Sequence, residues 1–191
     1  MKTIYYWILF MLLQTQVALA KTEVYKIDSL HSFAKWKVRH IVAKTAGTFS
    51  NITGTITLDR DHLEASKVDA TINVFSLNSN YKARDIQLLS ADYFNATQFK
   101  TIHFVSHSLK KINEDSAVLS GKLTLHGVSH EMALPFKLLG FGEDPWGNQR
   151  AGFEINTSLK RSDYGITKGL EGIIGDVVEI NLLIEGVKIV E

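Results

Sequence analysis

The chain reads Ala34-Lys35-Trp36-Lys37-Val38-Arg39 near its N-terminal end, and every apolar side chain in this stretch is followed by a basic one. Successive side chains of a β-strand point to opposite faces of a sheet, so this stretch has one apolar and one charged face. The same period of two returns further along the chain, with apolar members at Ile52, Ile56 and Leu58; Val68, Ala70, Ile72 and Val74; Met132, Leu134, Phe136 and Leu138; Phe153, Ile155 and Leu159; and Val178, Ile180, Leu182 and Ile184. The pattern predicts an all-β chain.

Turn sequences separate these segments, among them Leu58–Asp61, Asn113–Asp115 and Gly142–Asn148. They are rich in Gly, Asn and Asp, which tolerate the backbone angles of tight turns. About eight strands with short connections predict an antiparallel sandwich or barrel. Periodicity alone does not tell whether the apolar faces fill the interior or line a cavity, since small barrels of both kinds exist.

The stretch from Ser79 to Asp92 lacks the period of two and contains good helix formers. It predicts a short helix with Ser79 or Asn80 as its N-cap. Tyr81, Ile86 and Leu89 are expected on or near the buried side of this helix.

The first twenty residues have the layout of a secretory signal peptide. Met1-Lys2 is positively charged, Ile4–Leu13 is almost wholly apolar, and Ala18-Leu19-Ala20 is a small-x-small cleavage pattern. The apolar run is too short for a stable membrane anchor. We therefore expect residues 1–20 to be removed near Ala20, residues 21–191 to form one domain, and the protein to be periplasmic or secreted.

Composition excludes several functional classes. The chain has 21 Lys and Arg against 20 Asp and Glu; the predicted signal peptide contains Lys2, which leaves 21 − 1 = 20 of each sign. A neutral surface gives no broad electrostatic reason to bind nucleic acid or an anionic membrane. With no cysteine in the chain, disulfides and thiol chemistry are excluded.

No catalytic or metal-binding motif is present. The chain lacks a Gly-x-Ser-x-Gly elbow, a glycine-rich phosphate loop and a His-Glu-x-x-His helix. His103 and His107 share strand parity, and His126 and His130 would share it in an unbroken strand. Neither pair has a recognised metal-ligand spacing. We expect no enzyme activity, no metal and no cofactor.

An ordered series of short phrases runs through the rest of the chain: Ile27–Phe33, Val38–His40, Gly47–Phe49, Gly54–Ile56, Arg84-Asp85, Leu89–Phe94, Gly121–Val128, Gly152-Phe153 and Arg161–Ile166. In this order and spacing they resemble the YceI-like family, secreted bacterial proteins with a lipocalin-like barrel that hold polyisoprenoid lipids. The resemblance implies an antiparallel lipocalin-like barrel around an apolar tunnel. It also implies a carrier or store for a prenyl quinone, a polyprenol or a polyprenyl phosphate. The sequence leaves open whether the barrel is a monomer or a homodimer.

If this resemblance holds, the large apolar residues on the inward parity are the expected tunnel lining: Phe33 or Trp36, Val38, Ile72, Val74, Phe104, Leu123, Leu125, Phe136, Phe153 and Ile155. His40 stands where the family typically has a histidine, and it is a candidate polar contact of the ligand; the alternative is a structural histidine bonded to a backbone carbonyl. Further candidates for head-group contacts are Arg39, Arg84, Asp85, Arg161 and Tyr164. Each lining residue has a structural alternative, since pocket linings and ordinary cores share this composition.

Three other functions remain open at this stage. A carrier of fatty acids or their amides would use the same tunnel, because an apolar wall discriminates poorly between chains of methylenes. An enzyme could act on a bound quinone or lipid through His40. A stress-response or interaction protein could use the barrel as a scaffold and hold no lipid.

Overall fold

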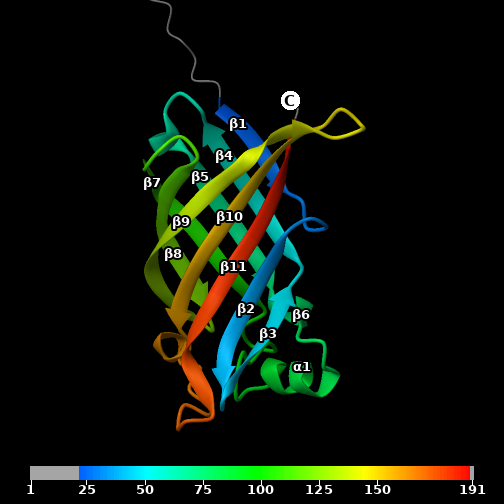
Figure 1. The fold of residues 1–191 in the computed structure, drawn as a ribbon, viewed down its shortest axis with the longest axis vertical. Coiled ribbons are helices and arrows are strands. Elements are labelled where there is room, and N and C mark those ends of the chain that lie inside the picture. The colour runs from blue at the N-terminus through cyan, green and yellow to red at the C-terminus, as the bar shows by residue number, and fades with distance from the viewer. Residues whose placement is uncertain (1–21, 190–191) are drawn as a thin grey trace, which may run out of the picture.

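The computed structural model describes residues 22–189, which form a tall antiparallel barrel with one short α-helix at its lower end (Figure 1). The predicted fold class is therefore confirmed. The strands are β1 (Thr22–Ile27), β2 (Phe33–His40), β3 (Ala43–Phe49), β4 (Ile52–Asp59), β5 (Lys67–Asn73), β6 (Leu77–Asn78), β7 (Thr101–Lys111), β8 (Ser116–Leu125), β9 (Val128–Glu143), β10 (Gln149–Lys160) and β11 (Ile174–Lys188). The helix is α1 (Lys82–Leu89), and 3-10 turns lie at η1 (Leu63–Ala65), η2 (Val74–Ser76) and η3 (Arg161–Tyr164).

Eight strands close the barrel in the order β1-β4-β5-β7-β8-β9-β10-β11, and β11 pairs back onto β1. The strands β2, β3 and β6 continue the sheet from β11 along its lower half. All of these pairings are antiparallel, and sequence neighbours are mostly partners in space, as short connections favour.

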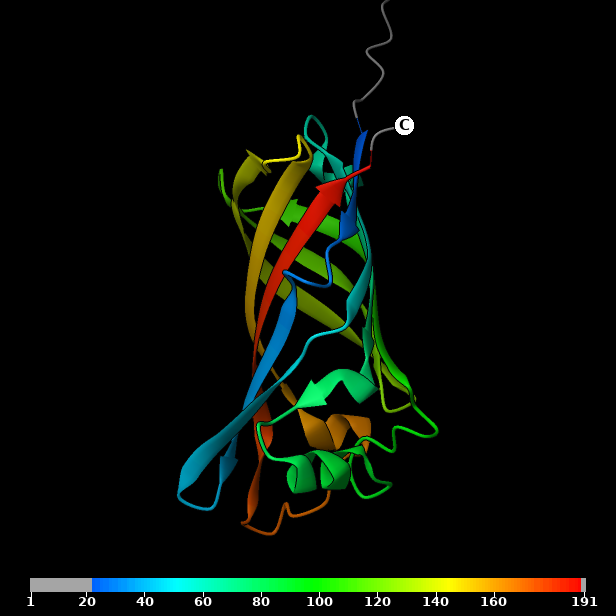
Figure 2. The same cartoon turned by 90° about the vertical axis from the view of Figure 1, so that its right-hand side faces the viewer.

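Strand β11 explains how the ring and its extension fit together. Its upper part, Gly186–Lys188, pairs with β1, and its lower part, Ile174–Leu183, pairs with β2. Strands β1 and β2 are thus two pieces of one wall, interrupted between Ile27 and Phe33. Strand β6 forms the edge of the sheet beside β3, and α1 follows it at the lower end of the barrel (Figure 2).

Helix α1 lies within the predicted stretch and buries Leu89 as expected, but it does not bury Tyr81 or Ile86. Leu88 and Leu89 pack against the core, whereas Tyr81 and Ile86 are each 62% exposed. Because each helical residue turns the direction of the side chain by about 100°, Ile86 points away from the side that carries Leu88. The helix begins after Tyr81, which makes no capping bond; the Asp85 carboxylate accepts the Ser79 backbone N–H instead.

Two observations concern membranes and export. Among residues 22–189 no helix is both long and apolar enough to span a bilayer. The predicted signal peptide, residues 1–20, lies outside the described residues.

Candidate functional site

The inner face of the barrel surrounds a cavity of about 570 Å³. The alternation of each strand turns its apolar parity inward, so all eight barrel strands and β2 contribute to the wall. The apolar lining comprises Ile27, Ala34, Trp36, Val38, Phe49, Ile52, Ile56, Leu58, Val68, Ala70, Ile72, Leu88, Tyr93, Phe94, Ile102, Phe104, Leu109, Leu119, Leu123, Leu125, Met132, Leu134, Phe136, Phe153, Ile155, Leu159, Ile166, Ile173, Ile174, Val178, Ile180, Leu182 and Ile184. The cavity therefore has the character of a lipid-binding interior.

The interior is lined rather than filled. Ile180, Leu182 and Ile184 point inward from β11 yet are only partly buried, because their side chains border the cavity. In a packed core such side chains would lose nearly all contact with solvent. The open interior thus settles the choice that sequence periodicity left undecided.

Two glycines make room for aromatic rings of the lining. A Cβ on Gly47 would lie 2.4 Å from Cζ2 of Trp36, and a Cβ on Gly121 would lie 2.7 Å from Cζ of Phe104. Each ring therefore lies flat over a neighbouring strand at a place where only glycine fits. These two pairs keep the Trp36 and Phe104 rings close to the wall.

The polar part of the lining is basic. Its charged or titratable members are Lys35, His40, Lys67, Arg84, Arg161 and Lys168, and among the described lining residues there is no Asp or Glu. His40, Arg84 and Lys168 belong to the end of β2, to α1 and to the loop before β11, which all lie at the lower end of the barrel (Figure 2). We call this end, together with Gln87 and Ile173, the mouth of the cavity. The mouth favours an anionic or hydrogen-bond-accepting group.

Arg84 and Asp85 are brought together by Ser79. The guanidinium of Arg84 donates to Ser79 Oγ at 2.8 Å and to the Ser79 carbonyl at 2.5 Å. Asp85 accepts from the N–H and the hydroxyl of Ser79, and it does not line the cavity. Arg84 is thus positioned at the mouth. Asp85 instead anchors the start of the helix, so the predicted head-group contact through Asp85 is wrong.

Arg161 lines the cavity but uses its donors within the protein. Its guanidinium donates to the carbonyls of Ile166, Ile174 and Gly175, which fixes the loop between β10 and β11. The side chain is buried, and this desolvation lowers its pKa. The segment forms a 3-10 turn followed by a longer loop, with Gly165 in the left-handed region at φ 74°.

Tyr164 lies outside the lining, contrary to the expected hydroxyl at the mouth. It is 2% exposed, and its ring packs edge-to-face on His130 with centroids 5.0 Å apart. Burial raises the pKa of its phenol. Its position within η3 turns the ring into the cluster formed with Tyr93, Leu125 and Ile166 rather than toward the cavity.

Of the residues proposed for the lining from sequence, Trp36, Val38, His40, Ile72, Phe104, Leu123, Leu125, Phe136, Phe153 and Ile155 border the cavity. Phe33 does not, because Ala34 and Trp36 point inward and the alternation places Phe33 on the outer face, where it is 36% exposed. Val74 does not either. The strand ends at Asn73, so Val74 starts a 3-10 turn and is buried in the core.

Arg39 also points away from the cavity, since it alternates with Val38 and His40. Its Nη1 donates to the carbonyls of Ile41 at 3.0 Å and Gly172 at 2.9 Å.

Sequence reasoning missed Lys168 at the mouth, because this residue lies in a loop without a periodic pattern. It also left out Ile180, Leu182 and Ile184, although their alternation was evident.

Trp36 contributes the one polar atom of the inner wall that is both buried and unsatisfied within the described residues. Its indole Nε1–H is buried and has no hydrogen-bond partner there. Buried polar groups are nearly always paired, and an unpaired one costs about 1–3 kcal/mol. Trp36 lines the cavity with another part of its ring, because the N–H itself is buried and does not face the open space.

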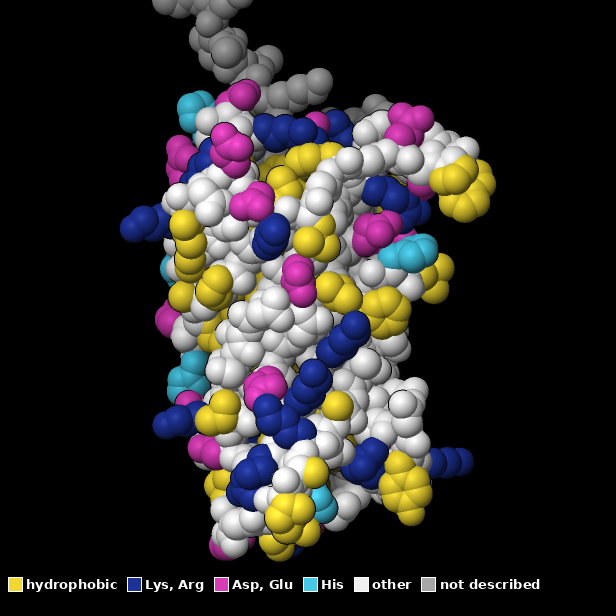
Figure 3. All heavy atoms as spheres, viewed as in Figure 1, with side chains coloured by type: hydrophobic (Ala, Val, Ile, Leu, Met, Phe, Trp, Pro, Cys, Tyr) yellow, Lys and Arg dark blue, Asp and Glu magenta, His cyan; other side chains and the backbone are white. Residues whose placement is uncertain are grey.

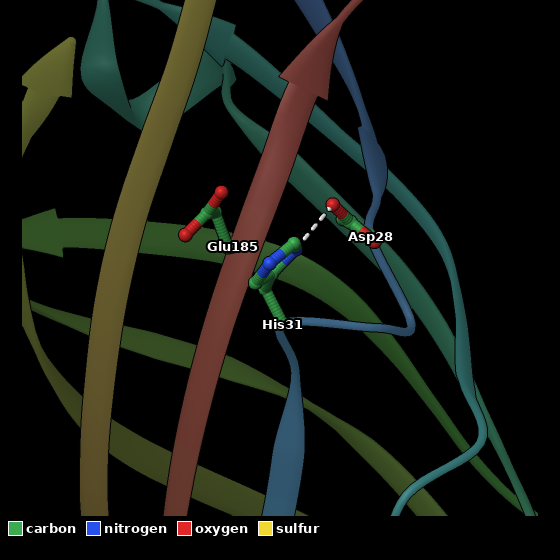
Figure 4. Close-up of side chains that lie close together, drawn as sticks. All are labelled: Asp28, His31 and Glu185. Atoms are coloured by element: carbon green, nitrogen blue, oxygen red, sulfur yellow. Dashed lines mark hydrogen bonds and ion pairs between the residues drawn. The ribbon is translucent and has the colours of Figure 1, made fainter. Parts of the chain in front are cut away.

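Asp28, His31 and Glu185 bring three possible metal-ligand atoms within 4.8 Å of one another (Figure 4). Arg150 Nη1 lies 2.8 Å from an Asp28 oxygen and 2.5 Å from a Glu185 oxygen, and His31 Nδ1 bonds to Asp28 at 2.8 Å. The guanidinium already occupies the space between these two carboxylates as their shared cation. The cluster is therefore an ion-pair network outside the cavity.

The other histidines considered as ligands have separate partners. His103 and His107 contact the carboxylates of Asp69 and Glu131, each at 2.9 Å. His126 and His130 instead contact backbone carbonyls in η3, at 2.9 Å and 3.0 Å. The structure thus brings neither histidine pair together as a metal site within the described residues.

Comparison with known proteins agrees with this architecture. The sequence profile of the YceI-like domain matches residues 25–186. The chain is 40% identical over 167 residues to a UPF0312 protein of Ectopseudomonas mendocina, covering 86% of this chain and 87% of that protein. It is also 40% identical over 167 residues to Protein YceI of Salmonella arizonae, covering 86% of each.

Solved structures share the fold. BcnA of Burkholderia cenocepacia superposes with a TM-score of 0.76 at 21% identity, over 83% of this chain and 98% of that one. A polyisoprenoid binding domain from Saccharophagus degradans superposes with a TM-score of 0.69 at 16% identity, over 86% and 98% of the two chains. Sequence, profile and architecture together show that the chain belongs to the YceI-like family.

Proposed function

We propose that this protein is an exported carrier that holds the chain of an isoprenoid lipid inside the barrel, for transport or storage. The observation that carries the proposal is the cavity of about 570 Å³ whose wall is apolar along the whole set of barrel strands. Each methylene moved from water into such a wall contributes about 0.8 kcal/mol, so a few isoprene units suffice for useful affinity. The related domain from Saccharophagus degradans is described as polyisoprenoid-binding, which supports the same class of ligand.

The basic mouth narrows the choice of head group. Arg84, Lys168 and His40 border the cavity without a lining carboxylate, so a phosphate would be attracted there. A quinone carbonyl could accept a hydrogen bond from Arg84 or Lys168 at the same place. A phosphate fits this end better than a neutral polyprenol or quinone, because only the phosphate brings negative charge to these cations.

A fatty-acid carrier is the second candidate, and the same observation favours it. A carboxylate would also pair with Arg84 and Lys168, and a straight chain would also fill an apolar interior. Competition between prenyl phosphates and fatty acids of matched chain length separates the two. No chemistry is required of the protein in either case; a His40→Ala variant that lost turnover of a quinone or lipid would instead establish an enzyme.

The first test is solvent extraction and mass spectrometry of protein purified without detergent from its native compartment. A stoichiometric prenyl quinone or polyprenyl phosphate is the expected result. A fatty acid would overturn the isoprenoid assignment, and an empty protein that also refuses added prenyl lipids would overturn the carrier function. Reading the N-terminus of the same sample tests the predicted cleavage near Ala20.

A blocked interior gives a matched test. Ala70 lines the cavity, so Ala70→Phe should abolish lipid binding, as should Ile180→Trp from the facing wall. Ala133 on β9 is exposed, so Ala133→Phe adds the same ring without entering the cavity and should leave binding unchanged. Folding of each variant is checked by circular dichroism; lipid retained by both folded blocked variants would contradict the proposal.

A further inference from the structure

The turn between β2 and β3 breaks the usual rules of a two-residue hairpin. It consists of Ile41 and Val42, which are 57% and 95% exposed. Ile41 has a positive φ of 53°, in a place that hairpins normally give to Gly, Asn or Asp. The β-branched Ile41 is strained at this positive φ. Because both side chains are exposed to water, they do not contribute to the stability of the fold. Backbone strain and exposed apolar side chains at the same turn indicate that the turn has a function other than stability.

This turn lies at the mouth of the cavity (Figures 1 and 2). The backbone N–H of Ile41 donates to the carbonyl of Ile173 at 2.8 Å, and Arg39 ties the carbonyls of Ile41 and Gly172 together. Ile173 is itself 52% exposed and lines the cavity. We call Ile41, Val42 and Ile173 the apolar lip.

Cations outnumber acids around the lip. The turn segment, α1 and the loop before β11, together with the acidic partners of their lysines, carry Arg39, Lys44, Lys82, Arg84 and Lys168 against Asp85, Asp92, Glu171 and Glu179. Lys44 pairs with Glu179 of β11, and Lys168 pairs with Asp92 at 3.4 Å, but all four side chains are more than half exposed. Basic side chains follow β2 down to the lower end, where apolar side chains lie at its tip (Figure 3). The overall charge is neutral, yet this end is basic.

We propose that the apolar lip inserts into the interface of an anionic lipid bilayer and sets the mouth of the cavity against the membrane. Exposed apolar side chains flanked by cations are the features that bind such a surface. A lipid could then pass between bilayer and cavity without crossing water. The docking itself depends on the lip alone, and only its use in lipid exchange rests on the proposed carrier function.

A membrane fits the lip better than a second copy of the chain. Three side chains at a projecting turn offer much less than the ~800 Å² that each partner buries in a standard protein interface. A two-fold contact at this end would also bring the same cations face to face, which opposes association.

The test uses flotation with vesicles of phosphatidylcholine containing phosphatidylglycerol, and with vesicles of phosphatidylcholine alone. The protein is purified without detergent, and its N-terminus is read by mass spectrometry. The variant Ile41→Gly/Val42→Asn removes both apolar side chains and supplies a residue suited to a positive φ, so it should fold at least as well. The control is Trp146→Ala, which removes a side chain that is 81% exposed in the β9–β10 turn at the opposite end.

The wild type and Trp146→Ala should float with anionic vesicles, and the turn variant should bind at least about ten-fold more weakly. Raising the salt concentration should weaken the wild type's binding. Equal binding by the folded turn variant, or absence of wild-type binding, would overturn the proposal. So would a loss of self-association in the turn variant, measured by sedimentation, without a loss of vesicle binding. Lipid extracted from protein that does not float would leave the carrier function standing and remove only the docking.

Discussion

Replacing Arg150 by methionine would remove the positive charge that holds three carboxylates at the seam of the barrel. Arg150 in β10 contacts Asp28 at 2.8 Å, Asp144 at 2.9 Å and Glu185 at 2.5 Å. These partners come from the β1–β2 connection, the β9–β10 turn and β11. One guanidinium therefore joins the strands where the ring closes. Methionine keeps the aliphatic stem and deletes only the charge and the donors.

The expected loss is intermediate between two limits. Removing one partner of a fully buried ion pair costs about 3–5 kcal/mol, and an exposed pair contributes about 0–1 kcal/mol. Because the side chains of Arg150 and Asp28 are 21% and 15% exposed, we expect about 2–3 kcal/mol at pH 7. The loss includes the mutual repulsion of carboxylates that no longer share a cation.

The pH dependence distinguishes this mechanism from simple loss of packing. Hydrogen bonds from Arg150, and then from His31, lower the pKa of Asp28 to about 2. A lowered pKa means that the stabilisation is present above about pH 4 and is lost as the pH falls toward 2. In Arg150→Met the carboxylates repel one another and take up protons at higher pH. The difference from the wild type should therefore fall to about half of its pH 7 value near pH 3.

Urea unfolding followed by tryptophan fluorescence at pH 7, 5 and 3 measures these differences. The control is Lys44→Met, which breaks the exposed pair with Glu179 and should change stability by less than about 0.5 kcal/mol. A loss in Arg150→Met that stays constant across the three pH values would refute the electrostatic reasoning. A loss of stability no larger than that of Lys44→Met would refute the conclusion that Arg150 joins these strands.

Two other sites give independent expectations. Glu23 is desolvated, but hydrogen bonds from Lys188, Tyr25 and Arg60 lower its pKa to about 2. Glu23→Gln should therefore cost about 1 kcal/mol at pH 7 and nothing near pH 2, and a pH-independent cost in urea unfolding would contradict this assignment. Trp36→Phe should leave the free energy of unfolding unchanged or raise it, because it deletes an unpaired buried N–H. Urea unfolding at pH 7 measures this effect, and a loss of more than about 1 kcal/mol would contradict it.

Much of the fold could be predicted from alternation, because inward and outward faces are fixed by a local period. The same rule located Trp36, Phe104 and Phe153 on the inner wall. It fails where a strand ends: Val74 keeps the parity of Ile72 in the sequence but starts a 3-10 turn. Periodicity carries no information about where hydrogen bonding stops.

The interruption between β1 and β2 could likewise not be predicted from the sequence. Strand β11 pairs with β1 along one part of its length and with β2 along another. Two separate strands of the chain therefore form one position in the barrel wall. Such a division depends on long-range register, which local patterns do not encode. The exposed Ile86 has the same origin, since the side of α1 that is buried is set by the strands beneath it and not by the apolar content of the helix.

The two ends of the barrel differ in a way that gives the cavity a direction. The upper end is held by ion pairs, with Arg60 contacting Glu23 at 2.7 Å and lying 3.8 Å over the ring of Phe141. The lower end carries the sheet edge formed by β6, the helix and the strained Ile41. A barrel wall that continued without interruption would hold both ends equally well. Because the sheet edge and the strained turn lie at the end where Arg84 and Lys168 border the cavity, we expect a lipid to enter there, tail first, and to leave its head group among these cations.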